Sequence, residues 1–267
     1  MMHRNRRLIY FLAALLVSAS VLPALLGQDD QASPGEMARK TIDEAIQAMG
    51  GDAYLNMKTL HNHGNWFAFD RHGRRSGLVR FWEYIHYDPL KWYFQLGKGG
   101  RQRVTVYNLE LNQGWKKEGK KYVEDIPQEE IDEFRKSAKH DLDVLLRHRA
   151  NDPDNNKLFY YGPDAISGGG DYVAVEFLDE ANDSAVLYFD RDTKLPAHIE
   201  YHRTDDMGNR LRTREEFYNW HEHNGVMIPM RRDILVEGNL VEQRHCTTVE
   251  VNPQIPPSQF LEPPVKK

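Results

Sequence analysis

Cysteine is the scarcest residue of this sequence, with a single copy, Cys246, among 267 residues. One thiol cannot form an internal disulfide, so the hydrophobic core alone has to hold the domain together. About 240 residues remain once an N-terminal leader is set aside, and a chain of that length buries a sizeable core without cross-links. We expect Cys246 to be a buried and inert thiol.

Catalytic signatures are also missing. The sequence contains no Walker loop, no G-x-S-x-G nucleophile elbow, no H-E-x-x-H zinc motif and no paired cysteine motif. We therefore expect no catalytic residues, no cofactor and no metal site. A function based on binding is favoured over an enzymatic one.

The longest apolar run is too short to span a bilayer. Residues 8–17 are continuously apolar, follow three arginines and precede small residues, whereas a spanning helix needs about 20 apolar residues. This order is typical of a cleavable signal peptide. We expect residues 1–27 to be removed, with cleavage after Gly27 or alternatively after Ala19, and residues 28–267 to form one exported domain. The alternative is a retained membrane anchor.

The exported domain contains fewer basic than acidic residues. Residues 1–27 hold three of the 35 basic residues and none of the 40 acidic ones, so the rest of the chain has a formal charge of −8. Binding to nucleic acid requires clustered lysines and arginines that neutralise phosphates. We expect no nucleic-acid partner.

A capped helix opens the exported domain. Ser33-Pro34-Gly35-Glu36 combines an N-cap residue, a proline at the first helical position and a capping-box glutamate. Apolar residues then recur at helical spacing as far as Met49. Gly50-Gly51 supplies the left-handed stop. The pattern predicts one helix that ends there.

Beyond this helix the apolar residues alternate, which predicts antiparallel strands joined by short turns. A short hairpin is expected around residues 117–120 in addition to eleven strands. The eleven strands are expected at residues 60–69, 78–87, 90–96, 101–108, 157–161, 171–178, 185–190, 197–203, 210–221, 226–237 and 240–251.

A second helix, expected from about residue 127 to residue 150, interrupts the strands. Its apolar residues form one stripe at three- and four-residue steps. A single sheet of this many strands must curl or close. The predicted fold class is therefore α+β, mainly β: a strongly curved antiparallel sheet with an N-terminal helix and a mid-chain lid helix over its concave face.

Four short motifs lie at strand ends, and in their order they carry a resemblance. They are Met49-Gly50-Gly51 ahead of Leu60, Tyr188-Phe189-Asp190 with Thr193 and Leu195-Pro196, Gly225-Val226-Met227-Ile228-Pro229, and Glu250-Val251-Asn252-Pro253 with Phe260 and Pro263. Together they resemble the outer-membrane lipoprotein carrier superfamily, the LolA-like proteins of the bacterial periplasm. The likeness spans most of residues 35–263.

The resemblance implies an incurved half-barrel of about eleven strands, whose lid helices cover a hydrophobic cavity for lipid acyl chains. It implies a periplasmic location and a single lipid- or lipoprotein-binding domain over residues 28–267. The superfamily's lid-latching arginine has four candidates here, Arg80, Arg103, Arg212 and Arg232. The lipidated cysteine of membrane-anchored relatives is absent.

Ligand pockets are mostly apolar with a few polar groups, so aromatic and aliphatic residues are the candidates for the cavity wall. For each of them the plain alternative is an ordinary core position. The candidates on the first three strands and on the mid-chain helix are Trp66, Trp82, Trp92, Phe94, Phe134, Leu142, Leu145 and Leu146.

Histidine, with twelve copies, is the abundant residue type that is capable of metal chemistry. The pairs His61/His63 and His221/His223 each place two imidazoles on one strand face, a spacing that suits metals. A metal site would require three or four such groups to converge. Solvated strand faces are the alternative, and we expect no tightly bound metal.

The predicted function is that of a periplasmic, non-enzymatic carrier or sensor of lipid acyl chains or lipoproteins, with envelope transport or signalling proteins as further partners. Each buried methylene contributes about 0.8 kcal/mol, so one long chain supplies on the order of 10 kcal/mol without any catalytic group. The alternatives are a metal-dependent periplasmic hydrolase that uses the histidine pairs, and a ligand-free scaffold protein of the envelope.

Overall fold

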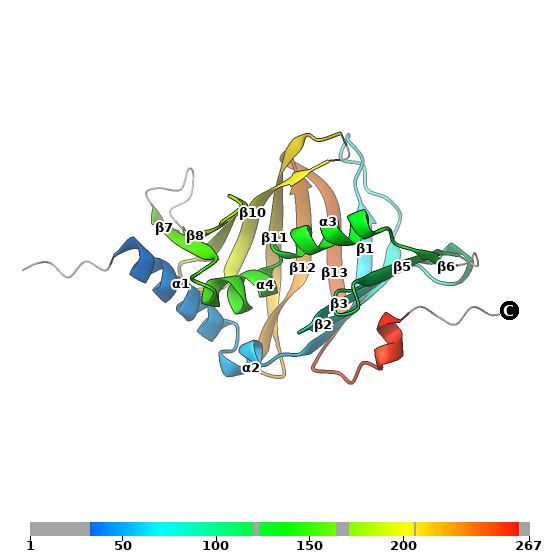
Figure 1. Cartoon of the computed structure of the whole chain (residues 1–267), viewed down its shortest axis with the longest axis horizontal. Helices are drawn as coiled ribbons and strands as arrows, with labels where there is room; N and C mark the ends of the chain where they lie inside the picture. Colours follow the sequence, from blue (N-terminus) through cyan, green and yellow to red (C-terminus); the bar gives the residue numbers. More distant parts are fainter. Residues whose placement is uncertain (1–32, 120–122, 164–170, 206, 262–267) are drawn as a thin grey trace, which may run out of the picture. The chain divides into compact units, whose positions relative to one another are not determined.

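The structure, a computed structural model, describes residues 33–119, 123–163, 171–205 and 207–261. The expected signal peptide with its cleavage sites lies outside the described residues, as does Pro263. Within them, thirteen strands form one antiparallel sheet in the order β6-β5-β4-β3-β2-β1-β13-β12-β11-β10-β9-β8-β7. The sheet is curved and does not close, and helices lie along one of its faces (Figure 1).

The strands differ greatly in length, from three residues to fourteen. They are β1 (Thr59–Ala68), β2 (Val79–Tyr87), β3 (Leu90–Leu96), β4 (Arg103–Asn108), β5 (Gln113–Glu118), β6 (Val123–Asp125), β7 (Asn156–Tyr161), β8 (Tyr172–Asp179), β9 (Ser184–Asp190), β10 (Pro196–Thr204), β11 (Arg210–His223), β12 (Val226–Val236) and β13 (Asn239–Val251). The helices are α1 (Pro34–Ala48), α2 (Asp52–Leu55), α3 (Gln128–Ala138) and α4 (Leu142–Arg147), and short 3-10 turns include η2 (Arg149–Asn151) and η4 (Pro257–Phe260).

The predicted fold class is confirmed: the chain is mainly β, with a curved antiparallel sheet and a few helices. In the described part of the chain the strand count is thirteen, because the hairpin expected around residues 117–120 contributes β5 and β6 in addition to the eleven other strands. These two strands form one edge of the sheet.

Helix α1 begins and ends where the local pattern predicted. The Ser33 hydroxyl accepts a hydrogen bond from the Glu36 amide at 3.3 Å, and the Glu36 carboxylate accepts one from the Ser33 amide at 2.7 Å. At the other end, Gly50 has φ +122°, and a Cβ there would lie 2.1 Å from the carbonyl oxygen of Gly225. The Met227 amide donates to the Met49 carbonyl at 2.9 Å, which joins the end of α1 to β12.

The prediction of a single helix from residue 127 to residue 150 is wrong, because the structure has two helices, α3 and α4, in this segment. Helix α3 ends at Ala138, and α4 begins at Leu142, with the Asp141 carboxylate as its N-cap acceptor for the Asp143 amide. The intervening residues are held by the β8–β9 turn: Lys139 Nζ lies 3.0 Å from Asp179 Oδ2, and His140 Nε2 lies 2.9 Å from Asp183 Oδ2. The apolar stripe runs through both helices because both pack on the same face of the sheet (Figure 1).

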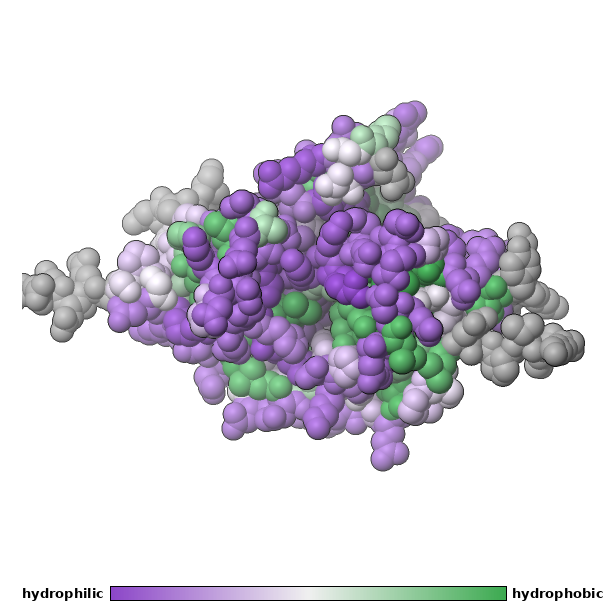
Figure 2. All heavy atoms as spheres, viewed as in Figure 1, coloured by the Kyte–Doolittle hydropathy of each residue, from purple (hydrophilic) through white to green (hydrophobic). Residues whose placement is uncertain are grey.

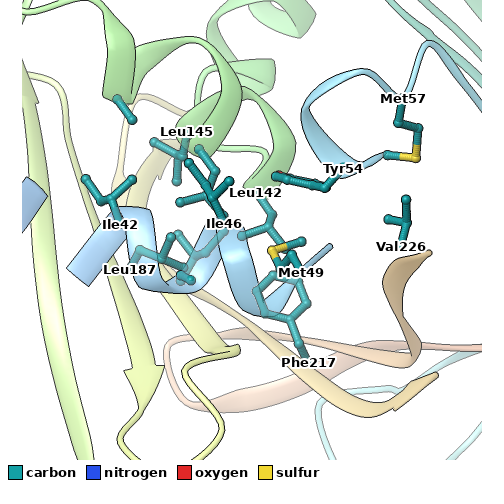
Figure 3. Packing of buried hydrophobic residues seen from close by; sticks show 14 of the residues in the cluster. Ile42, Ile46, Met49, Tyr54, Met57, Leu142, Leu145, Leu187, Phe217 and Val226 are labelled. Atoms are coloured by element: carbon teal, nitrogen blue, oxygen red, sulfur yellow. The ribbon is translucent and has the colours of Figure 1, made fainter. Parts of the chain in front are cut away.

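The main core lies between α1, α4 and the sheet (Figure 3). Ile42 of α1, Leu145 of α4 and Leu187 of β9 are fully buried in it. Helix α4 is also tied to β2, because the Tyr87 hydroxyl donates to Asp143 Oδ2 at 2.8 Å. Helix α4 is therefore part of the core, whereas α3 buries only Ile131.

Candidate binding pocket beneath helix α3

A pocket of about 200 Å³ lies between α3, the α3–α4 junction and the helix-covered face of the sheet. Figure 2 shows a hollow between α3 and α4, with apolar atoms gathered below α3. The residues that line the pocket are Glu83, Ile85, Tyr87, Leu90, Trp92, Phe134, Ser137, Ala138, His140, Asp141, Val144, Tyr201, Glu215, Arg232, Ile234 and Arg244.

One wall of the pocket is aromatic. The Phe134 ring of α3 stacks on Tyr107 of β4, with centroids 3.9 Å apart, and lies 5.6 Å from the Trp92 ring of β3. Trp92 in turn stacks on Phe94 at 5.3 Å. Burial raises the pKa of Tyr107, and the Glu130 carboxylate, which accepts a hydrogen bond from its hydroxyl, raises it further. This wall holds α3 to the sheet through stacked rings.

Next to the aromatic wall the pocket lining is charged, a feature that the predicted set of aromatic and aliphatic wall residues does not include. Glu83, only 6% exposed, accepts hydrogen bonds from Trp92 Nε1 at 2.9 Å, Asn62 Nδ2 at 3.0 Å and Arg244 Nη1 at 3.2 Å. Burial alone would raise the pKa of Glu83, but the guanidinium groups of Arg244 and Arg232 outweigh it and lower the pKa. Glu83 is therefore an ionised carboxylate inside the fold.

Asp141 brings a second unusual carboxylate to the pocket, at the junction of α3 and α4. Burial raises its pKa to about 7, the neighbouring Asp143 carboxylate raises it as well, and Arg232 opposes both effects. A carboxylic acid that titrates near neutral pH at the N-cap of α4 makes the junction sensitive to pH.

The structure divides the eight predicted wall residues into three groups. Trp92 and Phe134 line the pocket, and Phe94 lies beside it in the stacked row. Leu142, Leu145 and Leu146 are buried in the main core between α1 and the sheet, so they are not at the pocket surface. Their roles in ligand binding stay predictions.

The two remaining candidates, Trp82 and Trp66, are not among the residues that line the pocket. Trp82 of β2 follows Phe81 and precedes Glu83, so it points to the opposite face of the sheet, where it stacks on His63 at 4.8 Å. Trp66 is paired with Arg244 in the β1–β13 register but is not among the residues that line the pocket.

The prediction named Arg232 as a candidate latch but missed the other charged residues of the pocket, although the sequence contains one signal for them. The apolar face of β12 is interrupted by a single charge, Arg232. An isolated charge on a buried strand face requires a partner, and the structure supplies Glu215 of β11 at 3.4 Å. Of the four candidate latch arginines, Arg232 lines the pocket, whereas Arg80, Arg103 and Arg212 are exposed.

The histidine pairs do not converge. His61 stacks on Tyr84 at 4.2 Å and His63 stacks on Trp82, both on the face of the sheet opposite the pocket. Among the described residues there is no group of three or more His, Cys, Asp or Glu side chains that could hold a metal ion. Cys246 is half-buried, and burial raises its pKa to about 11, which keeps the thiol protonated at neutral pH.

Comparison with solved structures identifies the architecture. A DUF1329 family protein from Desulfovibrio piger superposes with a TM-score of 0.53 at 14% identity, covering 86% of this chain and 98% of that one. A domain described as an outer membrane lipoprotein-sorting protein from Vibrio parahaemolyticus also has a TM-score of 0.53, at 10% identity, with 85% and 97% covered. The chain has the LolA-like fold.

A LolA superfamily protein from Nitrosomonas europaea aligns with a lower TM-score of 0.42, at 12% identity over 84% of this chain and 97% of that one. No family model and no curated protein sequence matches the chain. In the described part of this LolA-like fold, none of the helices has both the length and the apolar character needed to cross a membrane.

Proposed function

We propose that this protein is a non-enzymatic, periplasmic binding protein that holds an acyl chain of a lipid or lipoprotein in the pocket beneath α3. The observation that carries the proposal is the pocket itself, which has a stacked aromatic wall under a helix with a single buried residue. The fold supports it, since a structure with this fold is described as a lipoprotein-sorting domain. The periplasmic location depends on the predicted signal peptide.

The size of the pocket implies that α3 moves when the ligand enters. Pockets for small molecules measure about 300–1,000 Å³, and this one measures about 200 Å³. Helix α4 is fixed in the core and the junction is held by Asp179 and Asp183. Helix α3 is held by Ile131, by the Phe134 stack, and by hydrogen bonds that join its polar side chains to Tyr107 and Asn112. We infer that α3 is the lid and that the junction is its hinge.

The direct test is mass spectrometry of lipids extracted from the protein purified from its native envelope, together with titration of a fluorescent fatty acid. Replacing Trp92 with Ala should weaken probe binding at least about fivefold, because it removes the aromatic wall. Trp82→Ala, on the other face, is the matched control and should bind as the wild type does. Equal loss in both variants, or no probe binding by the folded wild type, would contradict the proposal.

Whether the protein is a carrier or a sensor depends on partners that load or read it. The hydrolase alternative receives no support from the described side chains, since His61 and His63 face away from the pocket and none of the described His, Cys, Asp and Glu side chains gather in a group of three or more that could hold a metal ion. A ligand-free scaffold would require the pocket to stay empty in the native envelope, which the lipid extraction measures directly.

A further inference from the structure

We propose that Arg232 and Arg244 form a polar subsite for the uncharged carbonyl oxygen of an ester- or amide-linked acyl chain. The inference rests on the proposed function, because the subsite is the polar end of the same pocket. It makes acylated esters and amides the ligand class, in preference to free fatty acids.

The two arginines are directly opposed in the β12–β13 register, and both line the pocket. Opposed like charges repel, and each is compensated by carboxylates. Arg232 pairs with Glu215 at 3.4 Å, and Arg244 pairs with Glu83 at 3.2 Å. Their side chains are 17% and 20% exposed, and the guanidinium groups lie over the rings of Phe217 and Phe94, at 5.7 Å and 4.7 Å from the ring centroids.

The hydrogen bonds of these guanidinium groups are incomplete. Each guanidinium carries five N–H donors. Among the described residues, Arg232 donates one hydrogen bond, to Glu215, and Arg244 donates two, to Glu242 and Glu83. A donor that loses its water without gaining an acceptor is costly. A ligand that fills this end of the pocket must therefore bring acceptor oxygens.

The charges of the pocket favour a neutral acceptor. Glu215 and Glu83 already pair with the two guanidinium groups, and Asp141 is a third acidic group that faces Arg232. A fatty-acid carboxylate would add a further negative charge close to them, and it would be repelled. An ester or amide carbonyl accepts from the free N–H groups without adding charge, while its chain lies along the Trp92–Phe134 wall.

The test uses two lipids that differ in one group. 1-Monopalmitoylglycerol has an ester carbonyl, and 1-O-hexadecylglycerol has a methylene in its place. In competition with a bound fluorescent fatty acid at pH 7.5, the ester should bind wild-type protein at least about fivefold tighter than the ether, as expected for a hydrogen bond to a charged donor. Palmitate should bind more weakly than the ester.

Binding of a palmitoyl amide of a short peptide distinguishes the two sources of such a carbonyl group, lipoproteins and glycerolipids. Binding tighter than that of monopalmitoylglycerol would support the subsite and favour lipoproteins, whereas weaker binding that still exceeds that of the ether would support it and favour glycerolipids.

Two double variants test which residues cause the preference for the ester over the ether. Arg232→Met combined with Glu215→Gln removes this ion pair as a whole, so that Glu215 is not left as an unpaired carboxylate, and it should reduce the preference for the ester over the ether. The matched control is Arg231→Met with Asp233→Asn, an ion pair of the neighbouring residue on the opposite face of β12, and it should keep the preference.

The results that would contradict the subsite differ from those that would contradict the proposed function. Equal affinity of ester and ether for the wild type, or tighter binding of palmitate than of the ester, would overturn the subsite while leaving the acyl-chain pocket intact. Retention of the preference in the folded Arg232 variant would also overturn it. If the protein binds neither the probe nor any of the lipids, the proposed function itself fails.

Discussion

The ring of Phe134 on α3 lies flat against the ring of Tyr107 on β4, with centroids 3.9 Å apart and planes within 3° of parallel. Trp92 completes the stack from β3. Since Ile131 is the only residue that α3 buries, these rings supply much of what holds the helix down. Each aromatic pair contributes about 0.5–1.5 kcal/mol in addition to the contribution from buried area. Stabilisation of this size is small enough for α3 to detach from the sheet while the rest of the domain stays folded.

Phe134→Ala should therefore release α3 without unfolding the domain. Amide hydrogen exchange in residues 128–138 should accelerate about tenfold or more, because the loss of the ring removes both stacking and buried area. The exchange of α4 should stay slow. Phe159→Ala, a change of an exposed phenylalanine on β7, is the control. Unchanged exchange in α3 would rule out the lid.

Leu145→Ala should behave in the opposite way. Leu145 is fully buried between α4, α1 and the sheet (Figure 3), so its truncation should lower the free energy of unfolding by about 2–5 kcal/mol. Urea unfolding measures this loss. Leu111→Ala, at a side chain that is 49% exposed, should cost little. If Leu145→Ala weakened probe binding and left stability unchanged, α4 would belong to the lid.

Asp141 predicts a pH dependence of defined sign. Its pKa is about 7 in the folded protein against an ordinary value of 3.8, so the folded state binds the proton more tightly. Stability from this group is then fully present below pH 4 and is lost as the pH rises through 7. Asp141→Asn keeps a capping oxygen and removes the charge.

Urea midpoints at pH 5 and pH 8 provide the measurement. The wild type should lose more stability than Asp141→Asn between these values, and the difference isolates Asp141 from the other groups that titrate. Parallel losses in the two proteins would show that Asp141 does not carry the effect.

The last prediction concerns metals. Dialysed protein should contain no stoichiometric transition metal, and a chelator should leave its melting temperature unchanged, because the described histidines form pairs rather than complete ligand sets. Elemental analysis measures the content. A bound metal that disappears in His61→Ala/His63→Ala, but not in His198→Ala, would contradict this prediction.

Local pattern alone was sufficient for α1 and for the strands. The capping box at Ser33 and the stop at Gly50 set the ends of α1, because caps depend on residues three or four positions apart. Alternation set the strands for the same reason, since side chains on a strand repeat every two residues. The total strand number then implied a curved sheet with a face to cover.

The pocket and its hinge depended on long-range contacts. Glu83, Glu215, Arg232 and Arg244 come from four different strands, and only their register places them around one cavity. Likewise, the stripe of apolar residues continues across residues 139–141, so periodicity favoured one helix. At the break, Asp141 caps α4, which is a local signal, whereas Asp179 and Asp183, about forty residues further along, anchor Lys139 and His140. A contact at that separation leaves no trace in the local pattern.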